Sequence, residues 1–593
     1  MEKPARLFDL PEYQLTHYAK PDMLAAKEQG VWRTYSTGEV VHQVEKLAAG
    51  LLRYGISGND LSPEGQDKIA IISNNRPEWI IVDQACQQIG AVLTPIYPTI
   101  NSLELKFILN DAAVKLIFVS DKPLYDKVCS IKNETPSLKD IFTFEKIEGA
   151  NHWTGLLAVP GTGEKATITQ IKNAIKPGHL ATIIYTSGTT GVPKGVMLSH
   201  HNIMSNVLAS YPILPIDKEG KTLSFLPLNH VYERMLNYLY IYAGVSVYYA
   251  ENMDTIGENL REVKPYIFTT VPRLLEKVYE RILTKGLELS GIKKKLFFWS
   301  MALGERFEIN KDLGGWYRFQ LRIANKLVFS KWREALGGKV QAIVTGSAAC
   351  QLRLLKLFTA AGVNILEGYG LTETSPVISV NRMEMKDRMF GTVGPVIDGV
   401  SVKIAEDGEI LCKGPNVMMG YYKRPDLTKE AVQDGWFHTG DIGELIDGKF
   451  LKITDRKKEL FKTSGGKYVA PLPIETKMKE SPFIEQIMVI GDERKFTSGL
   501  IVPNFNHLSD WLKQQSITNG TPEEMIQKPE VLSLIRKEVD KFNQLFNHVE
   551  QIKKFELLPA EWTIESGELT PTLKLKRKVI LEKYHDIIDK IYQ

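Results

Sequence analysis

The sequence has few cysteines, no long apolar run and little excess charge. Only four of its 593 residues are cysteines, and none are at metal-ligand spacing, so neither a disulfide framework nor a cysteine-based metal site is indicated. The longest uncharged apolar stretch, 235–250, is shorter than the roughly 20 residues that span a bilayer, and we expect a helix end followed by a buried strand there. The N-terminus has no signal-peptide core. A net charge of +4 carries no nucleic-acid signature. We therefore expect a cytoplasmic protein with no transmembrane segment and no nucleic-acid partner.

Several familiar motifs are also missing. The G-x-x-x-x-G-K-[ST] loop of common nucleotide-binding enzymes does not occur, and no carrier-attachment motif follows the last domain. The segment "GTGEKA" at 161–166 fits a dinucleotide fingerprint weakly. Because a proline precedes it and no clear helix start follows, we predict a loop there.

Short apolar segments alternate with helical patterns along most of the chain. An amphipathic helix is predicted at 35–56, and strand-like segments such as "KIAIISNN" and "KVQAIVTGSA" end in Gly, Ser, Thr or Asn. This alternation indicates an α/β fold with largely parallel sheets, whose ligands gather at the carboxyl ends of the strands. From about 391, close-set glycines and alternating strands indicate a small β-rich subdomain. We predict an N-terminal domain at 1–453 with two α/β subdomains and the β-rich one, a hinge at 454–456, and a small α+β C-terminal domain at 457–593.

One loop has the composition of a phosphate site. "YTSGTTGVPKG" at 185–195 follows the apolar strand "ATIIY" and combines glycines with hydroxyl residues and a lysine. Backbone N–H groups and hydroxyls in such a turn can surround phosphate oxygens. The predicted phosphate-binding residues are Thr186, Ser187, Gly188, Thr189, Thr190, Gly191 and Lys194. The role of Lys194 stays open, since Pro193 precedes it and no Gly-Lys-Ser turn exists.

Five segments in order resemble the signature motifs of the adenylate-forming superfamily, which includes acyl-CoA synthetases, adenylation domains of peptide synthetases, and luciferases. They are the loop above, "EGYGLTETSP" (367–376), "WFHTGDIG" (436–443), "TDRKKELFKTSGGKYVAP" (454–471) and "LTPTLKLKRK" (569–578). Together they cover nearly the whole chain. "LPLNHVYER" (226–234) resembles the segment that borders the acyl site in the long-chain fatty acyl-CoA synthetases.

The resemblance implies a role for each matching residue. Glu373 and Thr186 would hold Mg²⁺, Asp441 the ribose diol, and Arg456 ribose or phosphate oxygens. The residues that would enclose the nucleotide are Gly346, Ser347, Ala348, Glu367, Gly368, Tyr369 and Thr372. Those that would line the CoA channel are Gly465, Gly466 and Lys467, and Asp455 would belong to the hinge. Tyr369 is suited to stacking on adenine.

The catalytic cation is predicted to be a lysine near the C-terminus. Attack of a carboxylate on the α-phosphorus brings two anions together, and a cation there stabilises the transition state. Lys574 is the first candidate and Lys576 the second, because the Ser-Gly or Thr-Gly pair that often precedes this lysine is replaced by Thr572-Leu573. His230 would help accommodate the carboxylate, or else is a satisfied histidine at a strand end.

The implied activity is long-chain fatty acid–CoA ligation with ATP, Mg²⁺ and CoA. Transfer to an acyl carrier protein and ligation of aromatic or branched acids are the alternatives. A basic insert at 281–335 holds twelve Lys and Arg against five Asp and Glu, together with Phe297, Phe298 and Trp299. This insert is either a peripheral contact with the inner face of a membrane or a solvated helical pair whose aromatics pack on the main domain. The protein is expected to be a monomer or homodimer.

Overall fold

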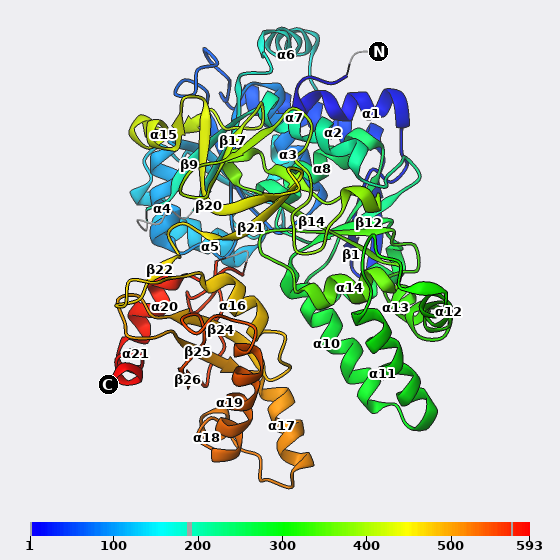
Figure 1. The fold of residues 1–593 in the computed structure, drawn as a ribbon. Coiled ribbons are helices and arrows are strands. Elements are labelled where there is room, and N and C mark those ends of the chain that lie inside the picture. The colour runs from blue at the N-terminus through cyan, green and yellow to red at the C-terminus, as the bar shows by residue number, and fades with distance from the viewer. Residues whose placement is uncertain (1–2, 187–191, 571–572) are drawn as a thin grey trace.

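The chain folds into a larger upper part and a smaller lower part (Figure 1). The computed structural model describes residues 3–186, 192–570 and 573–593. The upper part contains two eight-stranded sheets and a five-stranded sheet, and the residues after β21 form the lower part. This mixed α/β architecture confirms the predicted fold class.

The first eight-stranded sheet is parallel through its centre. Its strands, in spatial order, are β18 (Gly420–Tyr421), β9 (Lys194–Ser199), β8 (Leu180–Thr186), β4 (Val92–Ile96), β3 (Lys68–Ile72), β5 (Val114–Val119), β6 (Asp140–Thr143) and β7 (Asn151–His152). β3 and β4 are buried along their whole length, as expected for strands covered on both faces. At one edge β8 turns back antiparallel into β9, and β18 adds to β9 from far along the chain.

The second eight-stranded sheet contains strands whose carboxyl ends carry predicted site residues, such as Gly346 and Glu367. Its order is β15 (Val377–Val380), β14 (Asn364–Gly370), β13 (Ala342–Thr345), β12 (Ile267–Thr270), β10 (Lys221–Ser224), β11 (Ser246–Tyr249), β1 (Leu24–Glu28) and β2 (Val31–Tyr35). β10 to β14 run parallel, so their carboxyl ends meet at one edge.

Helices α3 (Pro77–Gln88) and α8 (Val231–Ala243) are buried almost completely and share a core with strands of both large sheets. Arg234 of α8 pairs with Asp83 of α3 and donates a 2.7 Å hydrogen bond from Nη1 to the Thr182 hydroxyl of β8. A buried charge requires such partners. The network fixes α8, whose first turn lines the pocket described below.

The remaining helices of the upper part cover the sheets or project from them. They are α1 (Leu10–Tyr18), α2 (Thr37–Arg53), α4 (Ser102–Asp111), α5 (Lys122–Ile131), α6 (Thr162–Ala174), α7 (His200–Ser210), α9 (Ile256–Val263), α10 (Pro272–Glu288), α11 (Gly291–Glu305), α12 (Gly314–Ala324), α13 (Ser330–Ala335), α14 (Leu352–Ala360) and α15 (Pro425–Ala431). α2 confirms the amphipathic helix expected at 35–56, and α8 with β11 confirms the helix and buried strand expected at 235–250. In the part of the chain that the structure describes, no helix combines the length and apolarity needed to cross a bilayer.

The β-rich region after 391 is the five-stranded sheet. It contains β16 (Ser401–Ile404), β17 (Glu409–Lys413), β20 (Trp436–Ile446), β19 (Val432–Gln433) and β21 (Phe450–Arg456). The predicted hinge at 454–456 therefore forms the end of β21.

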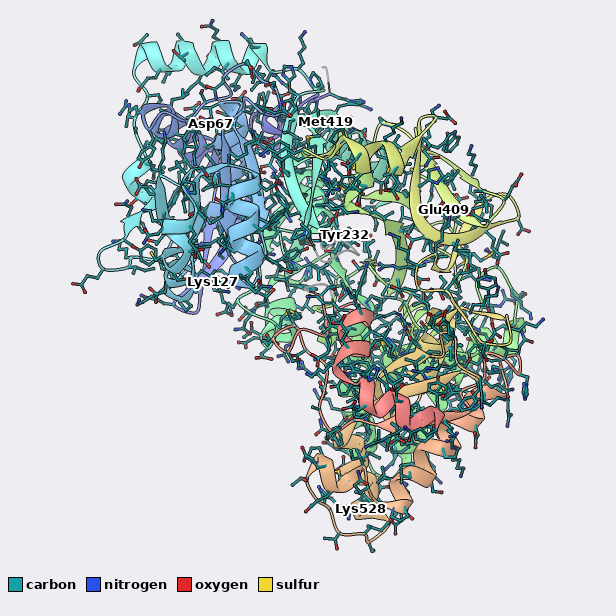
Figure 2. The ribbon with its side chains drawn as sticks, turned by 90° about the vertical axis from the view of Figure 1, so that its left-hand side faces the viewer. Asp67, Lys127, Tyr232, Glu409, Met419 and Lys528 are labelled. Atoms are coloured by element: carbon teal, nitrogen blue, oxygen red, sulfur yellow. The ribbon has the colours of Figure 1, made fainter. Side chains whose placement is uncertain are left out.

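The lower part has its own core of strands and helices. The strands are β22 (Phe461–Lys462), β23 (Tyr468–Val469), β24 (Ile484–Ile490), β25 (Ser498–Pro503) and β26 (Lys554–Leu557), and the helices are α16 (Pro471–Met478), α17 (Phe505–Gln514), α18 (Pro522–Met525), α19 (Pro529–Asn543), α20 (Arg577–Lys583) and α21 (His585–Tyr592). Figure 2 shows Tyr232 near the middle of the molecule and Lys528 at the far end of this lower part.

The predicted loop at 161–166 is wrong. Helix α6 begins at Thr162, and the Glu164 carboxylate accepts a 2.8 Å hydrogen bond from the Gly161 backbone N–H. Such capping satisfies an N–H group at a helix start. Glycine lacks a capping hydroxyl, so the helix start was not evident from sequence.

Candidate active site

The predicted phosphate loop connects β8 to β9. These strands pair antiparallel, with Thr186 opposite Lys194, so both residues stand at the base of the loop. Ser187, Gly188, Thr189, Thr190 and Gly191 lie outside the described residues.

Lys194 and Glu373 approach each other around Tyr421. Lys194 Nζ stands 5.3 Å from the centre of the Tyr421 ring, a cation–π distance. The Tyr421 hydroxyl donates a 2.9 Å hydrogen bond to Glu373 Oε1. β18 carries Tyr421 to this place by pairing with β9. Tyr421 was not singled out in the sequence, since nothing there connects it to a residue 48 positions away.

Glu373 is a half-buried carboxyl that follows β14. Thr372 and Glu373 lie in a 3₁₀ turn, Thr372–Thr374, and burial raises the pKa of Glu373. A hard cation would replace the lost hydration of this carboxylate. Within residues 3–186, 192–570 and 573–593, no cluster of three or more His, Cys, Asp or Glu could hold a metal ion. One carboxylate suits a Mg²⁺ whose other ligands are phosphates and water.

The residues predicted to enclose adenine come from the carboxyl ends of two neighbouring strands. Gly346, Ser347 and Ala348 come directly after β13, and Glu367, Gly368 and Tyr369 lie in β14, which pairs with β13. Glu367 accepts a 3.2 Å hydrogen bond from the Cys350 N–H, and burial raises the pKa of Glu367 to about 8.

Asp441 connects this region to the hinge. The Tyr369 hydroxyl donates a 2.7 Å hydrogen bond to Asp441 Oδ2, and Arg456 Nε lies 3.7 Å from Asp441 Oδ1. Asp441 and Arg456 face each other in the β20–β21 pair. Burial raises the pKa of Asp441, which the charges of Arg456 and Lys574 counteract.

Lys574 reaches this group from the lower part. Its N–H bonds to the Thr570 hydroxyl at 3.0 Å, and its carbonyl accepts from the Thr570 N–H at 2.8 Å, which forms a short turn. Burial, and next the charge of Arg456, lower the pKa of Lys574 to about 8, while Asp441, Glu459 and Glu373 act in the opposite direction. Lys576 instead precedes α20 and donates its backbone N–H to the Glu568 carbonyl at 2.7 Å.

His230 both caps α8 and lines a pocket. Its Nδ1 accepts a 3.2 Å hydrogen bond from the Tyr232 N–H. Burial, and next the charge of Lys574, lower the pKa of His230 to about 4, so the ring is neutral at neutral pH. With Nδ1 acting as acceptor, the proton of the neutral ring is on Nε2, which can donate a hydrogen bond.

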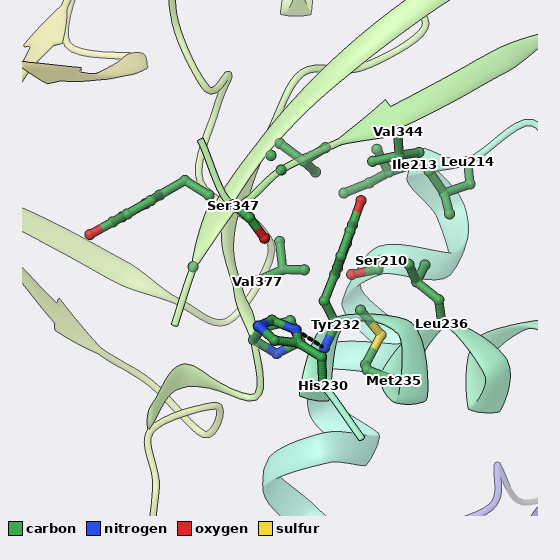
Figure 3. A pocket seen from close by; sticks show the side chains of 16 residues that line it. Ser210, Ile213, Leu214, His230, Tyr232, Met235, Leu236, Val344, Ser347 and Val377 are labelled. Atoms are coloured by element: carbon green, nitrogen blue, oxygen red, sulfur yellow. Dashed lines mark hydrogen bonds between the residues drawn. The ribbon is translucent and has the colours of Figure 1, made fainter. Parts of the chain in front are cut away.

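The pocket beside His230 has walls that are mostly apolar (Figure 3). Its apolar wall comprises Ile213, Leu214, Met235, Leu236, Val344, Pro376, Val377 and Val380. Gly346, Ser347, Gly368 and Tyr369 complete it, so the apolar pocket adjoins the predicted nucleotide residues.

The hinge and the predicted CoA segment are arranged differently. Asp455 accepts hydrogen bonds from the N–H groups of Arg456 (2.6 Å) and Leu472 (3.2 Å), which connects β21 to α16. Gly465, Gly466 and Lys467 form an exposed turn between β22 and β23, where the φ of +76° at Gly466 favours glycine. Lys574, and no residue of this turn, interacts electrostatically with both Asp441 and Glu373.

A second contact holds the lower part against α10. Arg273 of α10 pairs with Glu485 of β24, and Lys479 Nζ lies 3.9 Å from Glu276 of α10. Gln351 donates from Nε2 to Glu276 Oε1 (3.0 Å) and to the Lys479 carbonyl (3.2 Å). Sequence reasoning missed these residues, since partners 75 or more positions apart leave no local pattern.

Comparison with known families agrees with this arrangement. The family model described as AMP-binding enzyme matches residues 14–422. The model described as AMP-binding enzyme C-terminal domain matches residues 459–593.

Similar proteins span nearly the same length. A protein named long-chain-fatty-acid–CoA ligase FadD15 from Mycobacterium bovis is 34% identical over 95% of this chain and 93% of the relative. Long chain acyl-CoA synthetase 6, peroxisomal, from Arabidopsis thaliana is 33% identical over 95% of this chain and 82% of the relative. Among solved structures, an anthranilate CoA ligase in complex with anthranoyl-AMP superimposes with a TM-score of 0.70 at 16% identity, covering 98% of this chain and 97% of that one.

Proposed function

The chain belongs to the AMP-binding enzymes, and on that premise we propose that it is a long-chain fatty acid–CoA ligase. The observation that carries the proposal is that Lys574 interacts electrostatically with Asp441, with Glu373 and with the neutral His230, which lines an apolar pocket. The long-chain relatives over 95% of the chain support the acyl class.

The proposed reaction has two steps. A carboxylate oxygen of the fatty acid attacks the α-phosphorus of ATP, and pyrophosphate leaves with the electrons of the broken P–O bond. The CoA thiolate then attacks the acyl carbonyl carbon, and AMP leaves as acyl-CoA forms. Adenylation is needed because AMP is a far better leaving group than oxide.

In the first step the neutral His230 would donate a hydrogen bond from Nε2 to the carboxylate of the fatty acid, and the ring would carry no charge of its own. Protonated Lys574 would stabilise the negative charge that develops around the α-phosphorus. Asp441 would hold the ribose diol as an acceptor, with Arg456 beside it.

Glu373 and Thr186 would hold Mg²⁺, which when bound neutralises phosphate charge. The hydrogen bond that Glu373 accepts from Tyr421 fits this role, since the hydroxyl orients the carboxylate. Lys194 would add positive charge near the same phosphates, from its position over Tyr421.

For the second step, rotation at 454–456 would withdraw Lys574 and bring Gly465, Gly466 and Lys467 to a CoA channel. Such hinge motions allow one site to serve two reactions. Lys574 would then serve the first step only.

The proposed acceptor and acid can be tested together. Pyrophosphate release is measured across fatty acids of increasing length, with CoA or acyl carrier protein supplied in separate series. We expect activity to rise toward long chains and thioester to form on CoA. A maximum at acetate, or at aromatic or branched acids, would contradict the long-chain proposal, and thioester on carrier protein alone would contradict the acceptor.

We also propose peripheral membrane contact through the basic insert, at α12 rather than at Phe297. Phe297 is buried against α10, where a Cβ added at Gly286 would overlap its ring, whereas Phe298 beside it is 37% exposed. Trp316 and Phe319 on α12 are instead 70% and 51% exposed and stacked on each other, with Arg318 between them in sequence. Exposed aromatics among basic residues suit an anionic interface.

Sedimentation with vesicles tests this contact. Binding to anionic vesicles should exceed binding to neutral ones and should fall in Trp316→Ala/Phe319→Ala. Leu545→Ala is the matched control, because Leu545 is 63% exposed in the lower part. Equal binding by the double variant and the parent protein would contradict the assignment.

A further inference from the structure

The apolar pocket contains two hydroxyl groups that a plain hydrocarbon chain would leave unpaired. They belong to Ser210, the last residue of α7, and Tyr232, in the first turn of α8, and both side chains line the pocket. Both oxygen atoms are buried, and neither has a hydrogen-bond partner within the described residues. Buried polar atoms without a partner are uncommon in folded proteins, because desolvation then goes uncompensated.

Both groups are hydrogen-bond donors under all ordinary conditions. Burial raises the pKa of Tyr232 well above its usual range, so the phenol keeps its proton. The serine hydroxyl does not ionise. The pocket therefore presents two neutral O–H groups, each able to donate and to accept.

The position of Tyr232 shows which part of a substrate its hydroxyl would meet. His230 and Tyr232 leave the start of α8 in different directions, and the Tyr232 hydroxyl is turned toward Ile213, Leu214 and Val344 (Figure 3). With the carboxylate at His230, the hydroxyl would meet a chain carbon beyond the carboxyl group and well short of the methyl end of a long chain.

We propose that this pocket selects fatty acids that carry a hydroxyl group in the carboxyl-proximal part of the chain, bound by Tyr232 and Ser210. This inference rests on the proposed acid-activating function and specifies its substrate. A hydroxyl on the chain can accept from one of these groups and donate to the other, which satisfies both. A site built with such groups distinguishes its ligand from the analogue that lacks the hydroxyl.

The test compares acids of equal length. Pyrophosphate release is measured with a saturated long-chain acid, the same acid hydroxylated near the carboxyl group, and the same acid hydroxylated at the methyl end. We expect kcat/KM for the carboxyl-proximal hydroxy acid to exceed that of the plain acid by about tenfold, as one satisfied buried hydrogen bond would give. The methyl-end isomer should gain no such advantage.

Two variants and a control connect the preference to these hydroxyls. Tyr232→Phe and Ser210→Ala should each lower the ratio of the two kcat/KM values, and together should bring it close to one. Tyr240→Phe is the matched control: Tyr240 is on the same helix, its hydroxyl is also buried, and it does not line the pocket. Its ratio should equal that of the parent protein.

Failure of this inference is distinguishable from failure of the proposed function. A ratio near one in the parent protein, with plain long-chain acids active, would overturn the inference alone. Loss of activity on all acids alike in Tyr232→Phe would also overturn it, since the hydroxyl would then serve a group common to every substrate. Inactivity of the parent protein on every acid would overturn both.

Discussion

Lys574 should make the first half-reaction fail at alkaline pH. Only its protonated form carries the charge that the proposed transition state needs. Burial and the neighbouring Arg456 lower its pKa to about 8, so deprotonation occurs at lower pH than for an ordinary lysine. Pyrophosphate release should therefore be level below about pH 7 and fall through about pH 8, to roughly one-tenth at one unit above the pKa.

Replacing Lys574 gives the size of its contribution. Removing one preorganised group that stabilises developing charge costs about 10²- to 10³-fold in rate, or about 3–4 kcal/mol. Lys574→Ala should lower pyrophosphate release by at least this factor and abolish the alkaline decline. Lys574→Arg should retain part of the rate and shift the decline to higher pH, because guanidinium stays protonated.

The assay separates the two half-reactions. Pyrophosphate release is followed against pH with fatty acid and ATP, and thioester formation is followed from supplied acyl-adenylate and CoA. Lys576→Ala is the control, and its first step should keep both rate and profile. The reasoning is refuted if Lys574→Ala slows both steps equally, if its alkaline decline persists, or if Lys576→Ala gives the larger loss.

Three further outcomes are expected. Arg273→Glu and Glu485→Arg should each slow pyrophosphate release roughly tenfold, because each breaks a largely buried ion pair. The double variant should recover most of the rate, and no recovery would contradict the pairing. Tyr421→Phe should raise the Mg²⁺ concentration for half-maximal pyrophosphate release about tenfold, because the donor that orients Glu373 is lost; an unchanged Mg²⁺ titration would argue against Glu373 as a ligand. Glu367→Gln should raise the Tm more at pH 8 than at pH 5. Burial raises the pKa of Glu367 to about 8 in the folded protein, so between its ordinary pKa and 8 this carboxyl is ionised in the unfolded chain and protonated in the folded one. The stability of the parent protein therefore falls as pH rises through this range, and glutamine removes that loss. Equal Tm differences at the two pH values would contradict this.

The fold class could be predicted because the burial of each strand and helix determines its pattern of apolar residues. Strands such as β3 and β4 are buried on both faces and read as continuous apolar runs, and α2 is amphipathic. Parallel strands also bring their carboxyl ends together, so tail residues such as Gly346 and Glu367 could be expected at one site. The helix at 162 was missed because its capping residue is glycine.

The partners of the candidate residues could not be predicted. Lys194 was ambiguous because its neighbour Tyr421 arrives on an edge strand from more than two hundred positions away. His230 left two alternatives open, and the structure satisfies both, since one ring nitrogen caps α8 while the ring lines the pocket. Side-chain contacts between distant segments depend on strand order, which composition and spacing do not specify.

The placement of Lys574 depends on a line of charges across the predicted hinge. Arg456 lies 3.7 Å from Asp441 on one side and 3.4 Å from Glu459 on the other. Glu459 in turn accepts a 3.2 Å hydrogen bond from Arg577, three residues after Lys574. Arg577 also pairs with Glu475 and donates to the Val489 carbonyl at 3.0 Å.

The proposed rotation of the lower part at 454–456 would keep some of these contacts and break others. Arg577, Glu475 and Val489 all belong to the lower part, so their bonds would move together with the lysine turn. The Arg456 contacts lie at the rotation point itself, and the Arg273–Glu485 pair crosses between the parts. Lys574 thus belongs to a unit whose contacts with the upper part include ion pairs such as Arg273–Glu485 and Arg456–Glu459, which a rotation could break and re-form. A cation built into β20 or β21 could not be withdrawn by such a rotation, which is a physical reason for placing the proposed catalytic cation more than a hundred residues beyond Asp441.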